Sequence, residues 1–255
     1  MRLEHVHHDS VGSTNDAARD LWRSGVRTPT LVTASQQTAA RGRSGRSWSS
    51  GRGGVWLSAL IPDCDAQIPP GLTPLVAGAA VARAAERFLP EATVQIKWPN
   101  DILVQGRKLA GVLCEREYTA DKPAATVIGI GINVANALPA GLPPSAIPPV
   151  SLTMLINPAA SPAANPHVNP DHVTDAVALS LVAMLTRGRA EALAEVGKRL
   201  AYIDEQITVH LPANDRTGIF RGIDAAGRAL VDIDRTREVF TSGEISIRSR
   251  TKESI

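Results

Sequence analysis

Four short apolar segments follow one another between residues 94 and 134, and they constrain the fold more than any other part of the chain. They read VQIKW, ILV, KLAGVLCE and TVIGIGINV, a composition typical of β-strands. Gln105 and Gly106 separate the second segment from the third, as expected for the turn of a β-hairpin. This region therefore predicts a sheet with at least one antiparallel pair.

Helical and strand patterns precede and follow this group. The segment 11–25 has Ser13 or Thr14 to cap a helix, a one-sided apolar face, and Gly25 to end it. Further helices are expected at 73–88 and 171–200, and further strands at 31–35 and 55–61. The mixture predicts an α+β domain.

The last fifty residues have a different pattern. Five short segments alternate apolar and polar residues, with turn-forming residues between them, and they predict a small antiparallel barrel or sandwich. We therefore expect two domains, at 1–202 and 203–255. Before them, the stretch 137–170 is rich in proline, alanine, asparagine and serine and is expected to be a long connector.

Composition excludes several classes of protein. No run approaches the roughly 18 apolar residues of a membrane helix, and the chain begins without a signal-peptide pattern. Cys64 and Cys114 are too few for a disulfide framework, which favours a reducing cytoplasm. The net charge of +2 is too small for a nucleic-acid coat. His5, His7 and His8 lack metal-ligand partners and are expected on a surface strand.

Residues 37–54 read QTAARGRSGRSWSSGRGG, which places four arginines and five glycines between two predicted strands. Glycines let backbone amides converge, and guanidinium groups match phosphate oxygens, so the segment predicts an anion-binding loop. It does not match the GxxxxGK[ST] pattern of the classical phosphate loop. The alternatives are a solvated surface loop, or an RGG-type RNA contact, which needs a longer repetitive segment with interleaved aromatic residues.

A second cluster of polar residues begins at residue 97, in KWPNDILVQGRKLAGVLCE. Pro99 removes one strand amide, so the chain must turn or bulge where Asn100 and Asp101 stand. Polar groups at such a break indicate a functional site. The alternative is a turn in which Asn100 and Asp101 satisfy only local amides.

A third segment, VIGIGINV, contains Gly129, Gly131 and Asn133 at the end of a predicted strand. Glycines in a strand allow a ligand to approach the backbone closely, but they serve side-chain packing equally well. By itself this pattern is weak evidence for a site.

Taken in order, these segments resemble the biotin protein ligase family. The matching pieces span almost the whole chain and read GSTND, QTAARGRSGRSW, KWPNDILVQGRKLAGVLCE, GIGIN and SGEISIR. The resemblance implies a catalytic domain of the class II aminoacyl-tRNA-synthetase-like type, with a central mixed sheet, and a C-terminal SH3-like β-barrel.

The resemblance also implies an ATP-dependent enzyme that uses Mg²⁺. Biotin and ATP first give biotinyl-5′-AMP and pyrophosphate, and the biotinyl group then passes to a lysine of a biotin carboxyl carrier domain, as in acetyl-CoA carboxylase. No side-chain nucleophile is needed, because the carboxylate of biotin attacks the α-phosphorus. Positioning and charge stabilisation are left to the protein. Relatives include monomers and homodimers, and the sequence does not decide between them.

The resemblance assigns roles to residues of this chain. Biotin is expected to contact Ser13, Thr14, Asn15, Gln37, Arg41, Gly42, Arg43, Lys108, Gly111 and Gly129. ATP is expected to contact Arg43, Arg46, Trp48, Lys97, Asn100, Asn133 and Arg248. The catalytic residues are expected to be Lys108, Arg43 and Asp101, with Asp101 helping to deprotonate the acceptor lysine. Asp101 and Asn133 are the candidate Mg²⁺ ligands.

Two departures from the family pattern lead to expectations of their own. Ala40 stands where the family loop usually has glycine, and its β-carbon restricts the backbone there. Only a dozen residues precede GSTND, whereas a winged-helix DNA-binding domain needs roughly 60. We therefore expect an enzyme that is not also a DNA-binding repressor. The alternatives are a lipoate-type ligase and a non-catalytic biotin-binding protein.

Overall fold

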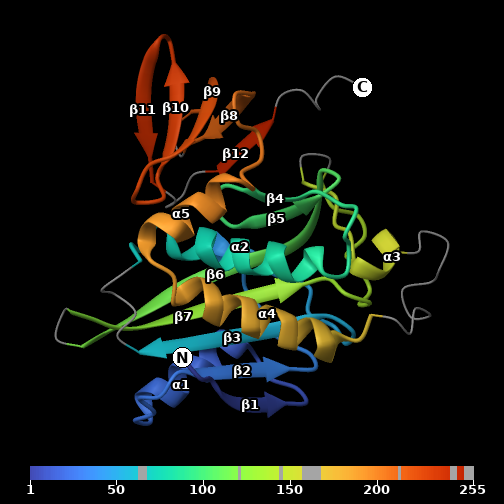
Figure 1. The fold of residues 1–255 in the computed structure, drawn as a ribbon. Helices are drawn as coiled ribbons and strands as arrows, with labels where there is room; N and C mark the ends of the chain where they lie inside the picture. The colour runs from blue at the N-terminus through green and yellow to red at the C-terminus, as the bar shows by residue number, and fades with distance from the viewer. Residues whose placement is uncertain are drawn as a thin grey trace.

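Two β-sheets of different size organise the chain in the computed structural model (Figure 1). The structure describes residues 1–62, 68–119, 122–143, 146–156, 168–211, 214–241 and 246–249. In the large sheet the strand order is β1-β2-β3-β7-β6-β5-β4, and in the small sheet it is β11-β10-β9-β8-β12. Cys64 lies outside the described residues.

The large sheet is mixed. Its strands are β1 (Glu4–His8), β2 (Thr30–Ala34), β3 (Val55–Pro62), β4 (Val94–Lys97), β5 (Asp101–Val104), β6 (Arg107–Thr119) and β7 (Lys122–Ile132). β1 pairs parallel with β2, and the other neighbouring pairs are antiparallel. This confirms the predicted α+β domain with a central mixed sheet.

The turn between β5 and β6 is the predicted two-residue hairpin. Gln105 has φ 51° and Gly106 has φ 70°, so both residues are in the left-handed region that a type I′ turn requires. β6 and β7 are longer than the sequence pattern indicated, because their pairing continues to Thr119 and Lys122.

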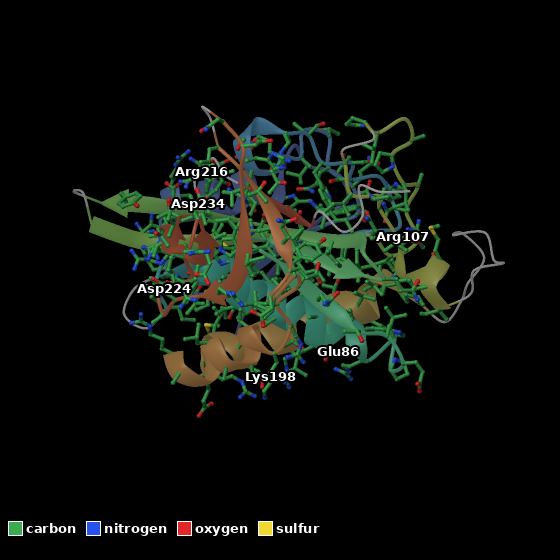
Figure 2. All side chains as sticks on the ribbon, turned by 90° about the horizontal axis from the view of Figure 1, so that it is seen from above. Glu86, Arg107, Lys198, Arg216, Asp224 and Asp234 are labelled. Atoms are coloured by element: carbon green, nitrogen blue, oxygen red, sulfur yellow. The ribbon has the colours of Figure 1, made fainter. Side chains whose placement is uncertain are left out.

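Helices cover both faces of the large sheet (Figure 1). They are α1 (Thr14–Arg23), α2 (Thr73–Glu86), α3 (Leu152–Ile156), α4 (Pro170–Leu185) and α5 (Arg189–Gly197), with a 3₁₀ turn, η1, at Arg43–Gly45. α1 packs on β2, β3 and β7, while α2 packs on β4, β5, β6 and β7 and against α4 and α5. Glu86 and Lys198 mark the side of α2 and α5 in Figure 2, where Arg199 pairs with Glu86 at 2.9 Å.

The helical pattern expected at 171–200 is confirmed, but it forms two helices, α4 and α5, rather than one. Thr186 ends α4, and Gly188 has extended backbone angles and begins α5, so the chain turns at residues 186–188. The apolar pattern is similar on both sides of this break, which is why periodicity alone joined the two helices. Within the described residues, no helix has both the length and the apolar character to cross a lipid bilayer.

The small sheet is antiparallel throughout. It consists of β8 (Gln206–His210), β9 (Arg216–Ile223), β10 (Ala229–Ile233), β11 (Thr236–Phe240) and β12 (Ser246–Ser249). Its β9–β10 turn contacts the large domain, where Trp98 Nε1 donates to the carbonyl of Gly227 at 3.0 Å. This sheet confirms the predicted small β domain, while the boundary at residues 202 and 203 stays a prediction.

The histidines near the start lie on β1, as expected. His5 and His7 are exposed, and their rings share the hydroxyl of Thr33 on β2, at 2.8 and 2.9 Å. Within the described part of the chain, no group of three or more histidine, cysteine or acidic side chains is arranged to hold a metal ion.

Candidate active site

A cavity of about 600 Å³ brings together segments that are far apart in the sequence. The predicted site residues that line it are Ser13, Thr14, Asn15, Gln37, Arg41, Gly42, Arg43, Arg46, Trp48, Lys97, Asn100, Asp101, Lys108, Gly111, Gly129 and Asn133. Arg248 is the exception. Its backbone pairs with Thr208 in the small sheet, and its side chain lies outside what the structure describes.

The arginine- and glycine-rich segment folds back on itself over the cavity. Arg41 and Ser47 form an antiparallel bridge, and the amide of Trp48 donates to the carbonyl of Ala40 at 3.1 Å. Ser44 and Gly45 form the tip, with φ of 54° and 69°. Ala40 does not have a positive φ, so glycine is not needed at that position and the alanine does not prevent the loop from folding.

One end of the cavity is a neutral wall made by Ser13, Thr14, Asn15 and Gln37, four residues from the start of α1 and the segment after β2. The amide and hydroxyl of Thr14 both donate to Gln37 Oε1, at 2.8 and 3.1 Å. Gln37 Nε2 donates to the hydroxyl of Ser50 at 3.0 Å. The wall is thus a set of oriented neutral hydrogen bonds.

A second part of the cavity lining, the charged end, centres on Asp101. Its carboxylate pairs with Lys108 Nζ at 2.5 Å and with Lys97 Nζ at 3.4 Å. Burial of Asp101 opposes its ionisation, but the charges of Lys108 and Lys97 together outweigh burial and hold the pKa of the carboxyl at about 2. Because such a carboxylate is a weak base, the expectation that Asp101 helps deprotonate an acceptor lysine requires Lys108 to move away first, and it stays a prediction.

Two arginines of the loop have different surroundings. Arg43 points to the charged end and donates to Asn100 Oδ1 at 3.4 Å, and its burial, with the nearby charge of Arg46, lowers the pKa of its guanidinium. Arg41 lies instead beside the neutral wall, where it binds both oxygens of Asp16, at 2.5 and 2.8 Å. That hydrogen-bonded pair lowers the pKa of Asp16.

The strand glycines accommodate side chains of this chain. A β-carbon on Gly131 would lie 2.6 Å from Trp48 Nε1, and one on Gly129 would lie 2.1 Å from Asn15 Oδ1. A β-carbon on Gly111, which pairs with Gly131 across β6 and β7, would lie 3.4 Å from the same indole ring. The glycines therefore leave room for the side chains of Asn15 and Trp48 close to the sheet, so here they serve packing within the chain.

The connector contributes to the cavity more than its composition indicated. The amide of Lys108 donates to the carbonyl of Pro148 at 2.8 Å, and the amide of Val150 donates to the carbonyl of Lys108 at 2.9 Å. These contacts hold the connector along β6. Its apolar residues that line the cavity are Pro139, Leu142, Pro143, Ala146, Ile147 and Pro149.

The proposed metal ligands do not form an open site. Asn133 is buried, and its Oδ1 accepts a hydrogen bond from Asn136 Nδ2 at 3.1 Å. Both oxygens of Asp101 are engaged by lysine ammonium groups, whose charge repels a divalent cation. The expectation that Asp101 and Asn133 hold Mg²⁺ therefore does not fit this arrangement.

Comparison with known proteins agrees with this fold and site. The sequence profile of the biotin/lipoate A/B protein ligase family matches residues 8–133, and that of the biotin protein ligase C-terminal domain matches residues 202–248. These matches thus place the chain in the biotin/lipoate protein ligase class. More narrowly, the chain belongs to the biotin protein ligase family, as its sequence resemblance indicated.

Individual relatives match to different extents. The biotin–[acetyl-CoA-carboxylase] ligase of Paracoccus denitrificans is 31% identical over 235 residues, which cover 91% of this chain and 96% of the relative. The bifunctional ligase/repressor BirA of Bacillus subtilis is 44% identical over 131 residues, or 51% of this chain. That match spans only 40% of the BirA chain, so less than half of that relative is represented here.

Among solved structures, the biotin protein ligase from Aquifex aeolicus in complex with biotin and ATP has a similar fold. The TM-score is 0.76 at 27% sequence identity, and the match covers 96% of this chain and 99% of the other. The similarity therefore includes both the large and the small sheet.

Proposed function

We propose that this protein is an ATP-dependent biotin protein ligase. It activates biotin to biotinyl-5′-AMP and transfers the biotinyl group to a lysine of a biotin carboxyl carrier domain, such as that of acetyl-CoA carboxylase. The observation that supports this most is the convergence of the four family segments, GSTND, the arginine loop, KWPND–KLAG and GIGIN, on one cavity. The relatives named above are ligases of this kind.

In the first step, a carboxylate oxygen of biotin forms a bond to the α-phosphorus of ATP, and the bond to pyrophosphate breaks. Two anions must approach each other, so the main task of the protein is to supply positive charge. Lys108, Arg43 and Arg46 line the cavity where this charge is needed. Lys108 would leave Asp101 for the biotin carboxylate and the α-phosphate, and Arg43 and Arg46 would bind phosphate oxygens.

The neutral wall would receive the ureido ring of biotin, which offers one carbonyl acceptor and two N–H donors. Ser13 is buried, lines the cavity, and makes no side-chain hydrogen bond within the described part of the chain. Its hydroxyl is thus available to a ligand. Thr14 and Gln37 are already oriented by each other, so little entropy is lost when a ligand binds to them.

In the second step, the amine nitrogen of the acceptor lysine attacks the acyl carbon, AMP leaves, and the amine loses a proton. While Asp101 holds Lys97 and Lys108, its pKa of about 2 makes it a poor proton acceptor. Once Lys108 has moved to the ligand anions, the carboxylate of Asp101 can accept the proton of the amine. Since lysines engage both oxygens of Asp101 in the structure and Asn133 Oδ1 accepts a hydrogen bond from Asn136, we infer that Mg²⁺ arrives bound to the phosphates of ATP.

The test is pyrophosphate release from the purified protein with MgATP, with biotin, with lipoate, and with neither. Release that requires biotin is the expected result, followed by transfer to a carrier domain added in a second assay. Release with lipoate alone would favour the lipoate-type alternative. Biotin binding without release would favour a non-catalytic binding protein.

A further inference from the structure

Ser58 lies behind the neutral wall and touches two of its members. It is on β3, is fully buried, and is not itself part of the cavity surface. Its Oγ lies 2.8 Å from Thr14 Oγ1 and 2.6 Å from Asn15 Oδ1. A buried hydroxyl with two such partners ties the orientation of one wall residue to that of the other.

Glu115, on β6, fixes the direction of the Asn15 amide. A carboxylate only accepts hydrogen bonds, so the group that meets Glu115 Oε2 at 2.6 Å must be Asn15 Nδ2. The oxygen of the same amide then faces Ser58. Gly129 leaves room for Asn15 only because it lacks a β-carbon.

The positions of the remaining protons follow from the donor and acceptor capacity of each group in the same way. Gln37 Nε2 donates to Ser50, so Gln37 Oε1 faces Thr14 and takes the proton of its hydroxyl. Thr14 Oγ1 and Asn15 Oδ1 therefore both act as acceptors toward Ser58, which has a single proton to share between them. Donors and acceptors are thus ordered at Thr14, Asn15 and Gln37, while the hydroxyl of Ser13 stays available to a ligand.

We propose that Ser58 and Glu115 are positioning residues that set the donor and acceptor pattern of the neutral wall, and so select a ligand with a urea-like head. This inference rests on the proposed function and deepens it. Loss of Ser58 removes one partner of the Thr14 hydroxyl and the partner of Asn15 Oδ1, and loss of Glu115 removes the carboxylate that fixes the direction of the Asn15 amide. The wall then loses its preference for a carbonyl acceptor flanked by N–H donors over a head of another polarity.

The test compares biotin with 2-iminobiotin, in which a guanidinium replaces the urea and an N–H donor replaces the carbonyl acceptor. Dissociation constants for both are measured by titration calorimetry for wild type, Ser58→Ala, Glu115→Ala and Glu115→Gln. Pyrophosphate release is measured separately. Glu117→Gln is the matched control, because Glu117 lies on the same strand as Glu115 and pairs with the same arginine of α1, Arg19, but makes no hydrogen bond to the wall.

In Ser58→Ala and Glu115→Ala we expect the preference for biotin over 2-iminobiotin to fall about tenfold, the worth of roughly one hydrogen bond. Glu115→Gln keeps one acceptor and should recover part of the preference, and Glu117→Gln should match wild type. Equal weakening of both ligands would mean that the two residues only support the fold, and would overturn the inference while the ligase function stands. Wild-type protein that binds neither ligand would overturn both, whereas binding without pyrophosphate release would overturn only the catalytic proposal.

Discussion

The two ends of the cavity are built from different interactions. The residues of the neutral wall are uncharged and are joined by directional hydrogen bonds, with one carboxylate, Glu115, behind them as an acceptor. The charged end is held by attraction between Asp101 and two lysines, which has little directional preference. The wall is therefore already shaped for its ligand, while the cations must exchange a protein carboxylate for a ligand anion.

The largest effect is expected from Lys108→Ala. It removes the cation placed to offset the biotin carboxylate and the α-phosphate, so adenylate formation should fall by on the order of 100-fold or more while biotin still binds at the wall. Lys198→Ala removes a surface lysine that pairs with Glu195 and is the control. If pyrophosphate release stays within a few-fold of wild type, Lys108 does not supply the charge needed for adenylate formation. The proposed division of roles between the charged end and the neutral wall would then be wrong.

Gly129→Ala tests the neutral wall, because Gly129 lies on β7 next to the side chain of Asn15. The new methyl group would lie 2.1 Å from Asn15 Oδ1, so Asn15 must move, at a cost of about 1–3 kcal/mol. We expect the KM for biotin to rise about tenfold or more, with the KM for ATP nearly unchanged. Gly188→Ala, where a β-carbon meets nothing within 4 Å, is the matched control. An equal rise in both KM values would argue against two separate ends.

The charged end should make stability depend on pH in a specific window. The pKa of Asp101 is about 2 in the folded protein against 3.8 ordinarily, so its ion pairs contribute stability above about pH 4. That contribution, about 2 kcal/mol, is lost as the pH falls toward 2. Urea unfolding of wild type and Asp101→Asn at several pH values isolates it from Glu195, whose pKa is also about 2 because Lys198 hydrogen-bonds to it. Parallel curves for the two proteins would contradict the prediction.

The smallest effect is expected from Asp16→Asn, which releases Arg41 at the neutral end. Both side chains are more than a third exposed, so solvent screens the pair and the loss of stability should stay below about 1 kcal/mol. The melting temperatures of wild type and variant should converge at high salt. A larger difference in melting temperature that persists at high salt would mean that the ion pair between Asp16 and Arg41 also holds the neutral wall in place.

Local sequence pattern was sufficient to predict most helices and strands, and the family motifs were sufficient to list most residues of the site. Alternating apolar residues and the Gln105–Gly106 turn predicted the hairpin, and the family segments predicted residues that now line one cavity. Periodicity did not show the break at residues 186–188, because the apolar face continues in register across it.

The sequence did not predict which side chains from distant parts of the chain contact the site residues. Ser58 did leave one signal, since it is the single polar residue in the strand VWLSALI. Glu115 and Asn136 left none, because surface acids and asparagines are common. The engagement of Asp101 with two lysines, which lowers the pKa of its carboxyl, depends on distances that only the folded chain sets.

Motifs that are continuous in the chain were enough to recognise the family, and the resemblance in turn implied the mixed sheet and the residues that line the cavity. How those residues divide the work depends on contacts that form only in the folded chain. Hydrogen-bond direction and the balance between burial and charge arise where Asn15 meets Glu115 and where Asp101 meets Lys108. The first of these contacts joins residues 100 positions apart, and the order of residues along the chain contains no record of it.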